Sequence, residues 1–438
     1  MAGAAGSGLP RFEAIVVGGG PSGLAAAYTM ADAGMRVAVI ERGDWSGSKN
    51  MMGGMIFTYP TATVIPDFWK EAPLERHITR RDFWICTKDA TIRGSYETED
   101  FGVEPCNAYS VFRSRFDKWL AGQAKAKGAY LITETLVEDL IQENGRVTGV
   151  RTGRPDGDLR ADVVILAEGV NTFLTEKAGL GPGMKSEYLA LGVKEILSLP
   201  KEKIEDRFNL EGDQGVAIEA AGETTAGLPG TGFIYTNRST ISIGVGVMLK
   251  DMVDRVTEPY FLLERFKEQP QVRRLISGTS PLEYSAHLIP EGGLHNMPRL
   301  CANGALVVGD AAGMVNAVHT EGANLALLSG KMAADTVIRC RGLGDYSARA
   351  LSHYCDLLDQ SLIMRDLKKY QDVAPFLARH PQLFRLYPEV MSTALKELLT
   401  VDMLSKSDKH RLIAKLVHSE IPVRRLARDI YDIWRTLA

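Results

Sequence analysis

The first segment of the 438-residue chain constrains its fold more than any other part. Residues 11–18 (RFEAIVVG) form an apolar run rich in β-branched residues, which predicts a short buried strand. Residues 21–34 carry helix-forming residues, and residues 35–41 (MRVAVIE) predict a second buried strand. A strand, tight turn, helix and parallel strand within about thirty residues make one βαβ unit.

The turn of this unit reads Gly18-Gly-Gly20-Pro-Ser-Gly23, a G-x-G-x-x-G pattern between strand and helix. Gly18 allows a sharp turn, and Gly20 has no Cβ that would keep a pyrophosphate away. Gly23 allows the helix to pack closely on the strand. The spacing predicts a nucleotide-binding turn.

Pro21 and Ser22 open the helix, whose free N–H groups and positive dipole end can face phosphates. Glu41 ends the second strand, where a carboxylate can accept the hydroxyls of a ribose. Strand, turn, helix and acid together predict that the chain binds a dinucleotide.

Two later segments favour FAD over NAD. Residues 162–169 (DVVILAEG) predict a buried strand that runs into Gly169, and residues 305–309 predict another that runs into Gly309-Asp310-Ala-Ala-Gly313. Their small residues allow backbone contact with an extended ligand, and Asp310 can bind a polyol hydroxyl. An NAD enzyme of this type would need no such further contacts.

A long helix is predicted over residues 320–339, with Gly322, Ala323 and Asn324 near its start. Its positive end would lie near one edge of the flavin and would stabilise negative charge on the reduced ring.

The middle of the chain has a different sequence pattern. Between residues 184 and 284, alternating strands such as 233–235 and 240–247 are mixed with loops rich in Gly, Thr and Glu. This pattern predicts an antiparallel-sheet domain inserted into the first domain, and the chain is helical after Asp345.

The expected fold is α/β: a Rossmann-like FAD domain, an inserted antiparallel-sheet substrate domain and a helical C-terminal region. We expect the FAD domain at 1–75, 108–183 and 286–344, the substrate domain at 76–107 and 184–285, and the C-terminal region at 345–438.

Composition excludes several classes of function. A net charge of −3 gives no reason to expect nucleic acid as a partner. The five cysteines form no C-x-x-C pair, so we expect no iron–sulfur or zinc site built by this chain alone. No apolar run approaches the roughly 18 to 20 residues of a membrane-spanning helix, and no signal peptide is evident. We expect a cytoplasmic protein, or one that lies on the cytoplasmic side of a membrane without crossing it.

Residues 111–117 (VFRSRFD) contain an R-x-x-F-D segment. With the motifs above, it resembles the glutathione-reductase-type FAD superfamily, in the branch of aromatic hydroxylases, geranylgeranyl reductases and quinone oxidoreductases. The resemblance implies that Arg113 reaches the cofactor, with Arg115 as the rival. It implies the superfamily's cofactor-binding roles for six residues of this chain, namely Gly18, Gly20, Gly23, Glu41, Arg113 and Asp310.

Further segments narrow the resemblance. Residues 47–54, 232–235, 284–293, 372–377 and 384–388 are together similar to the electron-transfer flavoprotein–quinone oxidoreductase family, and within it to the shorter bacterial FixC branch. The resemblance covers nearly the whole chain. It adds further cofactor-binding candidates, namely Arg42, Lys49, Asn50, Gly53 and Gly54.

The family resemblance implies a reaction and partners. A two-subunit electron-transfer flavoprotein would pass electrons to the FAD, and the reduced flavin would deliver them to a quinone. Longer family members end in a ferredoxin-like domain with a [4Fe–4S] cluster, whereas no cysteine follows Cys355 here. The resemblance therefore implies a separate ferredoxin-like iron–sulfur subunit. In FixABCX-type assemblies the partner flavoprotein supports electron bifurcation, of which this sequence carries no sign.

A quinone needs an apolar slot with a few hydrogen-bond donors. We expect residues 228–233, Leu228 to Phe233, to wall this slot, with the backbone N–H groups of Gly230 and Thr231 facing a carbonyl and Gly232 and Phe233 beside them. His287 is the candidate proton donor, although a buried structural histidine is an alternative for it and for His319. No metal-ligand constellation emerges.

The C-terminal helices carry apolar and aromatic residues among basic ones, with Phe376, Phe384 and Tyr387 near Lys368 and Arg379. This mixture suits an anionic membrane surface, and equally a face buried against protein. Two other functions stay open: a stand-alone geranylgeranyl-reductase-like enzyme and an aromatic hydroxylase. A subunit that keeps FAD only as a scaffold is a third alternative.

Overall fold

The computed structural model describes residues 10–49 and 54–437. The chain divides into two compact units, each built from three stretches. The predicted C-terminal region does not form a unit of its own, because residues 345–368 belong to the first unit and the remainder to the second. The first unit comprises Met1–Leu74, Val111–Tyr188 and Ile289–Lys368, and the second comprises Glu75–Ser110, Leu189–Leu288 and Lys369–Ala438.

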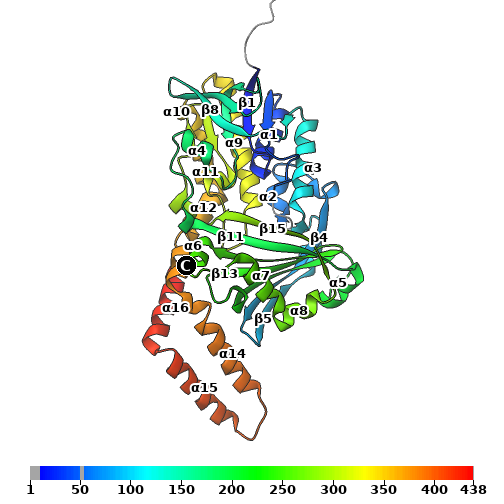
Figure 1. The fold of residues 1–438 in the computed structure, drawn as a ribbon, viewed down its shortest axis with the longest axis vertical. Coiled ribbons are helices and arrows are strands. Elements are labelled where there is room, and N and C mark those ends of the chain that lie inside the picture. Colours follow the sequence, from blue (N-terminus) through cyan, green and yellow to red (C-terminus); the bar gives the residue numbers. More distant parts are fainter. Residues whose placement is uncertain (1–9, 50–53, 438) are drawn as a thin grey trace, which may run out of the picture. The chain divides into compact units, whose positions relative to one another are not determined.

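The first unit contains a sheet in the order β16-β17-β10-β1-β2-β7. The first of these strands along the chain, β1, is labelled in Figure 1 and drawn in dark blue. The pairings of β1 with β2 and β10, of β2 with β7 and of β10 with β17 are parallel, as expected for buried strands of a Rossmann-like domain. The strands are β1 (Arg11–Val17), β2 (Val37–Ile40), β7 (Tyr130–Ile132), β10 (Leu159–Leu166), β16 (Cys301–Ala302) and β17 (Ala305–Val307).

The sequence of residues 130–149 predicts a hairpin with Asn144-Gly145 as its turn, whereas the hairpin in the structure runs over residues 137–152. Strands β8 (Val137–Glu143) and β9 (Arg146–Thr152) form it around Asn144 and Gly145, which have positive φ angles of 49° and 73°. Residues 130–132 instead form β7, which pairs in parallel with β2. The sequence pattern predicts strands in this region, but it does not show that residues 130–132 pair with β2 and stand outside the hairpin.

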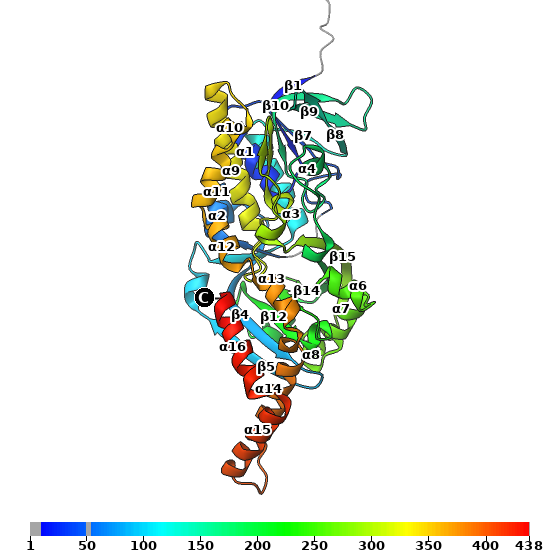
Figure 2. The ribbon, with the colours of Figure 1, turned by 90° about the vertical axis from the view of Figure 1, so that its left-hand side faces the viewer.

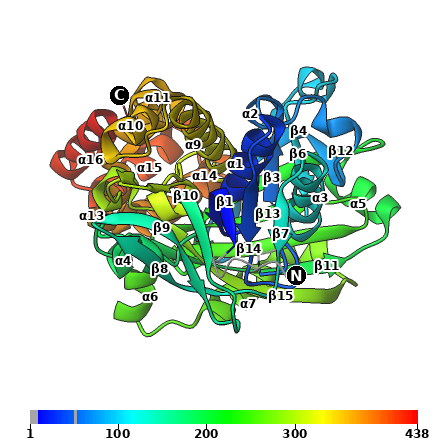
Figure 3. The ribbon, with the colours of Figure 1, turned by 90° about the horizontal axis from the view of Figure 1, so that it is seen from above.

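Helices α1 (Pro21–Asp32) and α9 (Ala323–Leu343) lie side by side in the first unit (Figure 3). A Cβ built on Gly330 would lie 2.0 Å from the backbone oxygen of Ser22, so the contact requires glycine. The predicted helix at 320–339 begins three residues late, because Thr320 has a positive φ of 57°. The other elements of this unit are β3 (Gly54–Phe57), α2 (Thr58–Ala62), α3 (Arg113–Ala126), α4 (Phe173–Lys177), α10 (Ala348–Leu351) and α11 (His353–Gln360).

The second unit is built on a sheet in the order β15-β11-β14-β13-β12-β4-β6, with β5 paired to β4. Strands β11, β14, β13 and β12 pair with their neighbours in antiparallel fashion, as predicted, but β12 pairs in parallel with β4, so the sheet is mixed. The strands are β4 (Leu74–Cys86), β5 (Thr91–Glu97), β6 (Ala108–Val111), β11 (Leu189–Ser198), β12 (Gln214–Gly222), β13 (Gly230–Thr236), β14 (Thr240–Met248) and β15 (Ser280–Pro290).

One hydrophobic core joins this second sheet to its helices. Val193, Ile234 and Ile243 of the strands are fully buried, as are Leu262 and Phe266 of α7. Alternate residues of each strand point to the core face, which explains the alternating sequence pattern. The helices are α5 (Lys201–Phe208), α6 (Leu249–Asp254), α7 (Pro259–Glu268) and α8 (Pro270–Ile276).

The chain ends in successive helices, of which α14 and α15 pack on each other (Figure 2). Lys409 is almost fully buried between them and donates hydrogen bonds to Asp402 (2.9 Å) and Glu397 (3.3 Å). Across residues 10–49 and 54–437, no helix is both long and apolar enough to cross a bilayer. The helices are α12 (Leu362–Tyr370), α13 (Val373–Arg379), α14 (Leu386–Leu399), α15 (Lys406–Glu420) and α16 (Val423–Leu437).

Candidate functional site

The carboxyl ends of the parallel strands gather the predicted cofactor residues at one edge of the first sheet. In the strand register Val17 is opposite both Ile40 and Leu166, and Leu166 is opposite Val307. The glycine turn, Glu41, Gly169 and the Asp310 segment follow these strand ends directly. The chain crosses from β2 on one side of β1 to β10 on the other, and ligands of such sheets bind at this switch point.

The three motif glycines have separate structural reasons. A Cβ on Gly18, whose φ is 109°, would lie 2.2 Å from the oxygen of Ala167, so Gly18 serves a close approach to β10 as well as the predicted turn. A Cβ on Gly23 would lie 2.1 Å from the oxygen of Gly18, which agrees with the predicted close helix packing. Gly20 caps α1 and has nothing within 4 Å of its Cβ position.

Helix α1 begins with Pro21, and its first turn contains no acidic residue. Its positive end is therefore not neutralised by this helix, which suits a phosphate. Ser22 is buried, and its hydroxyl lies against Gly309: a Cβ on Gly309 would lie 2.6 Å from the Ser22 Oγ atom. The predicted contact of Ser22 with the cofactor stays a prediction.

The carboxylate of Glu41 is held by two backbone groups. Gly19 N–H donates to Oε2 (2.8 Å) and Gly43 N–H donates to Oε1 (2.7 Å). Beside it, within the described part of the chain, the buried hydroxyls of Ser46 and Ser48 have no hydrogen-bond partner. Buried polar groups are nearly always paired, so these hydroxyls point to a polar ligand. Our sequence interpretation missed both serines, although they follow the acidic residue closely.

Arg113 is the first residue of α3 and is paired with Asp117, which is fully buried. The guanidinium donates from Nε to Oδ1 (2.9 Å) and from Nη2 to Oδ2 (3.0 Å). Burial lowers the pKa of Arg113, but the charges of Asp117 and, after it, Asp310 outweigh burial and raise the pKa. The structure thus brings Arg113 near Asp310, whereas its contact with a cofactor remains predicted.

The Asp310 segment leads to the start of α9. Gly309 and Gly313 adopt positive φ angles of 63° and 71°, which glycine allows without strain. Gly322 precedes the first helical residue, Ala323. Asn324 is buried and its Nδ2 donates to Glu321 (2.9 Å).

Two buried polar atoms near this helix start have no partner among the described residues, namely Oδ1 of Asn324 and Nδ2 of Asn316. With the phosphate-type helix start and the unpaired serine hydroxyls, they fit an extended, polar cofactor such as FAD. When bound, FAD supplies a carrier that takes up and gives up one or two electrons.

The remaining cofactor candidates have weaker structural support. Arg42 and Lys49 are exposed, and Gly54 begins β3. Gly169 has a φ of 69° and open space at its Cβ position. The other two candidates, Asn50 and Gly53, lie outside the described residues.

The structure does not bring the predicted quinone residues together. Gly230–Phe233 lie on β13 and His287 lies on β15, with β14 and β11 between them. At about 4.8 Å per strand, the two strands are roughly 14 Å apart, too far for direct proton transfer within one small slot. Packing alone explains the glycine at position 232, because a Cβ built there would lie 2.2 Å from Cγ2 of Thr224.

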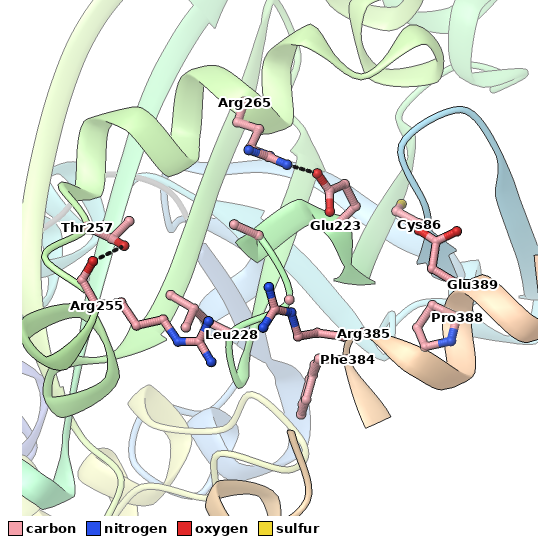
Figure 4. A pocket seen from close by; sticks show the side chains of 12 residues that line it. Cys86, Glu223, Leu228, Arg255, Thr257, Arg265, Phe384, Arg385, Pro388 and Glu389 are labelled. Atoms are coloured by element: carbon pink, nitrogen blue, oxygen red, sulfur yellow. Dashed lines mark hydrogen bonds and ion pairs between the residues drawn. The ribbon is translucent and has the colours of Figure 1, made fainter. Parts of the chain in front are cut away.

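A cavity of about 410 Å³ lies elsewhere in the second unit (Figure 4). It includes Leu228 from the predicted quinone wall, but none of Gly230–Phe233. Its lining carries three arginines and two glutamates, whereas a quinone requires a mainly apolar slot. The lining residues are Cys86, Glu223, Ala226, Gly227, Leu228, Arg255, Thr257, Arg265, Phe384, Arg385, Pro388 and Glu389.

The described residues contain no cluster of three or more His, Cys, Asp or Glu side chains that could hold a metal ion. All five cysteines lie within the described part of the chain, and none of them forms a disulfide.

Comparison with known proteins agrees with the geometry. Residues 13–171 match the family of FAD-dependent oxidoreductases, and residues 373–437 match the C-terminal domain of the ETF-QO/FixC family. The chain is 46% identical over 408 residues to protein FixC of Bradyrhizobium diazoefficiens, covering 92% of this chain and 94% of that protein. It is 42% identical to protein FixC of Azotobacter vinelandii, covering 98% and 99%.

A third relative is a probable electron transfer flavoprotein-quinone oxidoreductase of Escherichia coli, 42% identical, covering 90% of this chain and 91% of that protein. Among solved structures, a geranylgeranyl bacteriochlorophyll reductase-like protein of Thermoplasma acidophilum has the same fold, with a TM-score of 0.73, 20% identity and coverage of 95% and 98%. The predicted family and fold class are thus confirmed: the chain belongs to the ETF-QO/FixC family and is an FAD-dependent oxidoreductase.

Proposed function

We propose that this protein passes electrons from a two-subunit electron-transfer flavoprotein, through its FAD, to a membrane quinone. The observation that carries the proposal is 42% identity, over 90% of the chain, to the probable electron transfer flavoprotein-quinone oxidoreductase of Escherichia coli. The convergence of the glycine turn, Glu41 and the Asp310 segment at one sheet edge supports the cofactor half of the proposal.

The residues of the first unit act by binding and orienting. The start of α1 receives the pyrophosphate, and Glu41, fixed by Gly19 and Gly43, accepts ribose hydroxyls. The start of α9 lies toward the flavin and favours negative charge there. Arg113, paired with Asp117, contributes positive charge near Asp310.

Two partners complete the proposal. The high identity to several FixC proteins supports membership of a FixABCX-type assembly, in which a ferredoxin-like subunit carries the [4Fe–4S] cluster. The five cysteines of this chain lie far apart in the sequence and form no C-x-x-C pair, so the cluster is better supplied by another chain. Bifurcation, if the assembly performs it, belongs to the partner flavoprotein.

The membrane contact is proposed for the turn between α14 and α15. Leu399, Val401 and Met403 are exposed by 73%, 91% and 100% there. Phe376, from the stripe that the sequence suggested, is buried instead. A flotation assay with anionic vesicles, comparing the wild type with Val401→Glu and Met403→Glu, tests this contact, and unchanged flotation of the double variant contradicts it.

The test of the function is anaerobic quinone reduction by the FAD-loaded protein together with its ferredoxin-like subunit. Reduced electron-transfer flavoprotein, NADH and NADPH are compared as donors. We expect turnover with the flavoprotein donor alone. Rapid reduction by a free nicotinamide with no response to the flavoprotein would overturn the proposal and favour a stand-alone reductase or hydroxylase.

A further inference from the structure

The charged cavity of the second unit is formed by segments that lie far apart in the chain. Cys86 ends β4, Glu223–Leu228 follow β12, and Arg255 and Thr257 follow α6. Arg265 lies on α7, and Phe384–Glu389 lead into α14. All these segments belong to one compact unit, so the cavity is a feature of that unit by itself.

The positive charges of this cavity are only partly neutralised. Arg265 forms an ion pair with Glu223 (Figure 4). For Arg255 and Arg385, by contrast, no carboxylate of the described residues lies within ion-pair distance. Figure 4 draws these two guanidinium groups near Leu228, whereas Glu389 is drawn beside Cys86. Arg255 still feels the charge of Asp251, but two guanidinium groups without a direct ion pair at one cavity favour an anionic ligand.

Arg385 is held in place by the backbone beneath it. Gly227 has a φ of 71°, and a Cβ built there would lie 2.3 Å from Cγ of Arg385. The stem of the arginine therefore passes directly over a glycine in the left-handed region, where another residue would both be strained and displace the stem. The cationic end is positioned by this local geometry without an acidic partner.

The neutral part of the lining indicates what accompanies the anionic group. Leu228 is buried, and Phe384 and Pro388 add apolar surface beside it. Burial raises the pKa of the Cys86 thiol, so this wall is neutral as well. An apolar or aromatic body attached to the anionic group would contact these side chains.

The surrounding surface is not generally basic. Over residues 249–268 the acidic residues are Asp251, Asp254, Glu258, Glu264 and Glu268, against the basic Lys250, Arg255, Arg265 and Lys267. Such a balance of charges attracts a polyanionic surface, for example an anionic bilayer, only weakly. A single anionic group that contacts two arginines is attracted more strongly. A monoanion also meets less repulsion from Glu223 and Glu389 than a phosphate dianion would.

We propose that this cavity binds a carboxylate carried by an apolar or aromatic body, with Arg255 and Arg385 holding the carboxylate oxygens. The carboxylate comes either from a free organic acid or from an acidic side chain of a partner protein. None of the residues that line the cavity belongs to the sheet edge proposed to hold FAD, and occupation of the cavity does not depend on the proposed electron transfer.

The test measures binding of phenylacetate, 3-phenylpropionate and octanoate to the FAD-loaded protein by calorimetry and ligand-observed NMR, at millimolar concentration. Phenylacetamide is the uncharged probe. We expect saturable binding of at least one acid, no comparable binding of the amide, and a loss of affinity of about tenfold or more in Arg385→Gln and in Arg255→Gln. Arg274→Gln, an exposed arginine of α8 outside the cavity, should bind like the wild type.

Equal binding of acid and amide, unchanged affinity in both arginine variants, or no saturable binding of any of the three acids would overturn the proposal. A second arm identifies the source of the carboxylate by measuring the affinity for the electron-transfer flavoprotein and the ferredoxin-like subunit. If the bound acid competes with a partner and Arg385→Gln lowers the affinity for that partner, the carboxylate comes from an acidic side chain of the partner. If acids bind, and neither the acid nor Arg385→Gln changes the affinity for either partner, the carboxylate comes from a free acid.

Discussion

The Oε2 atom of Glu41 accepts a hydrogen bond of 2.8 Å from the backbone N–H of Gly19 in the turn after β1. Its other oxygen accepts one of 2.7 Å from Gly43. The single side chain thereby joins the glycine turn to the end of β2, and both oxygens keep lone pairs for further donors. The carboxylate is therefore already oriented for the ribose contact that we propose.

Glu41→Gln is expected to lower FAD affinity by about tenfold or more. An amide has one accepting oxygen, so its NH₂ group must face one of the two backbone N–H groups, at a cost of about 1–3 kcal/mol. The measurement is FAD dissociation followed by flavin fluorescence, with flavin content after gel filtration as a second readout. Glu187→Gln, at an exposed position of the same unit, is the control. FAD affinity equal in both variants would contradict this role.

Gly330→Ala should destabilise the first unit by about 2 kcal/mol or more. In an open helical site this change stabilises by about 1 kcal/mol, but here the new Cβ would lie 2.0 Å from the Ser22 backbone oxygen, and α9 would have to move away from α1. Gly122→Ala in α3 is the matched control, because nothing lies within 4 Å of its Cβ position. Chemical denaturation should shift the two variants in opposite directions; parallel shifts would show that the helix contact is loose.

The meeting of the glycine turn, Glu41 and the Asp310 segment at one sheet edge was predictable because each segment carries a local signal. The glycine turn, Glu41 and the Asp310 segment each follow an apolar strand pattern, and parallel strands bring their carboxyl ends together. No further information is needed to place them at one edge. The family resemblance was likewise confirmed over nearly the whole chain.

Features that depend on tertiary contact were not predictable. The requirement for glycine at position 330 exists only where α9 meets Ser22, more than three hundred residues earlier. The separation of His287 from Gly230–Phe233 follows from strand order, which strand patterns do not reveal. Arg255 and Arg385 meet at one cavity through loops and helix ends, where the sequence has no periodic pattern.

Arg76→Leu should destabilise the second unit by about 3–5 kcal/mol. The guanidinium is fully buried and donates to the backbone oxygens of Asn237 (2.8 Å), Gly212 (2.9 Å) and Gln214 (2.9 Å). Leucine leaves these carbonyls without their donor. Arg76→Lys should recover part of the loss, because an ammonium group can still reach some of them. Hydrogen exchange of the second sheet measures the effect, and exchange unchanged in the leucine variant would contradict it.

Glu291 is expected to make the folded protein less stable as the pH rises. Burial raises the pKa of this carboxyl from 4.5 to about 7. Between these values the folded state keeps a proton that the unfolded state has released, so a rising pH favours unfolding. The stabilising contribution is fully present below the lower value and is lost as the pH approaches about 7, with a slope of at most about 1.4 kcal/mol per pH unit.

Glu291→Gln removes this titration. The difference in unfolding free energy, variant minus wild type, should therefore rise between about pH 4.5 and pH 7 and level off above it. Denaturant unfolding at a series of pH values measures the difference, and Glu283→Gln, at an exposed position of β15, is the control. Profiles of variant and wild type that run parallel across this interval would mean that Glu291 is already ionised in the folded protein, with its charge solvated.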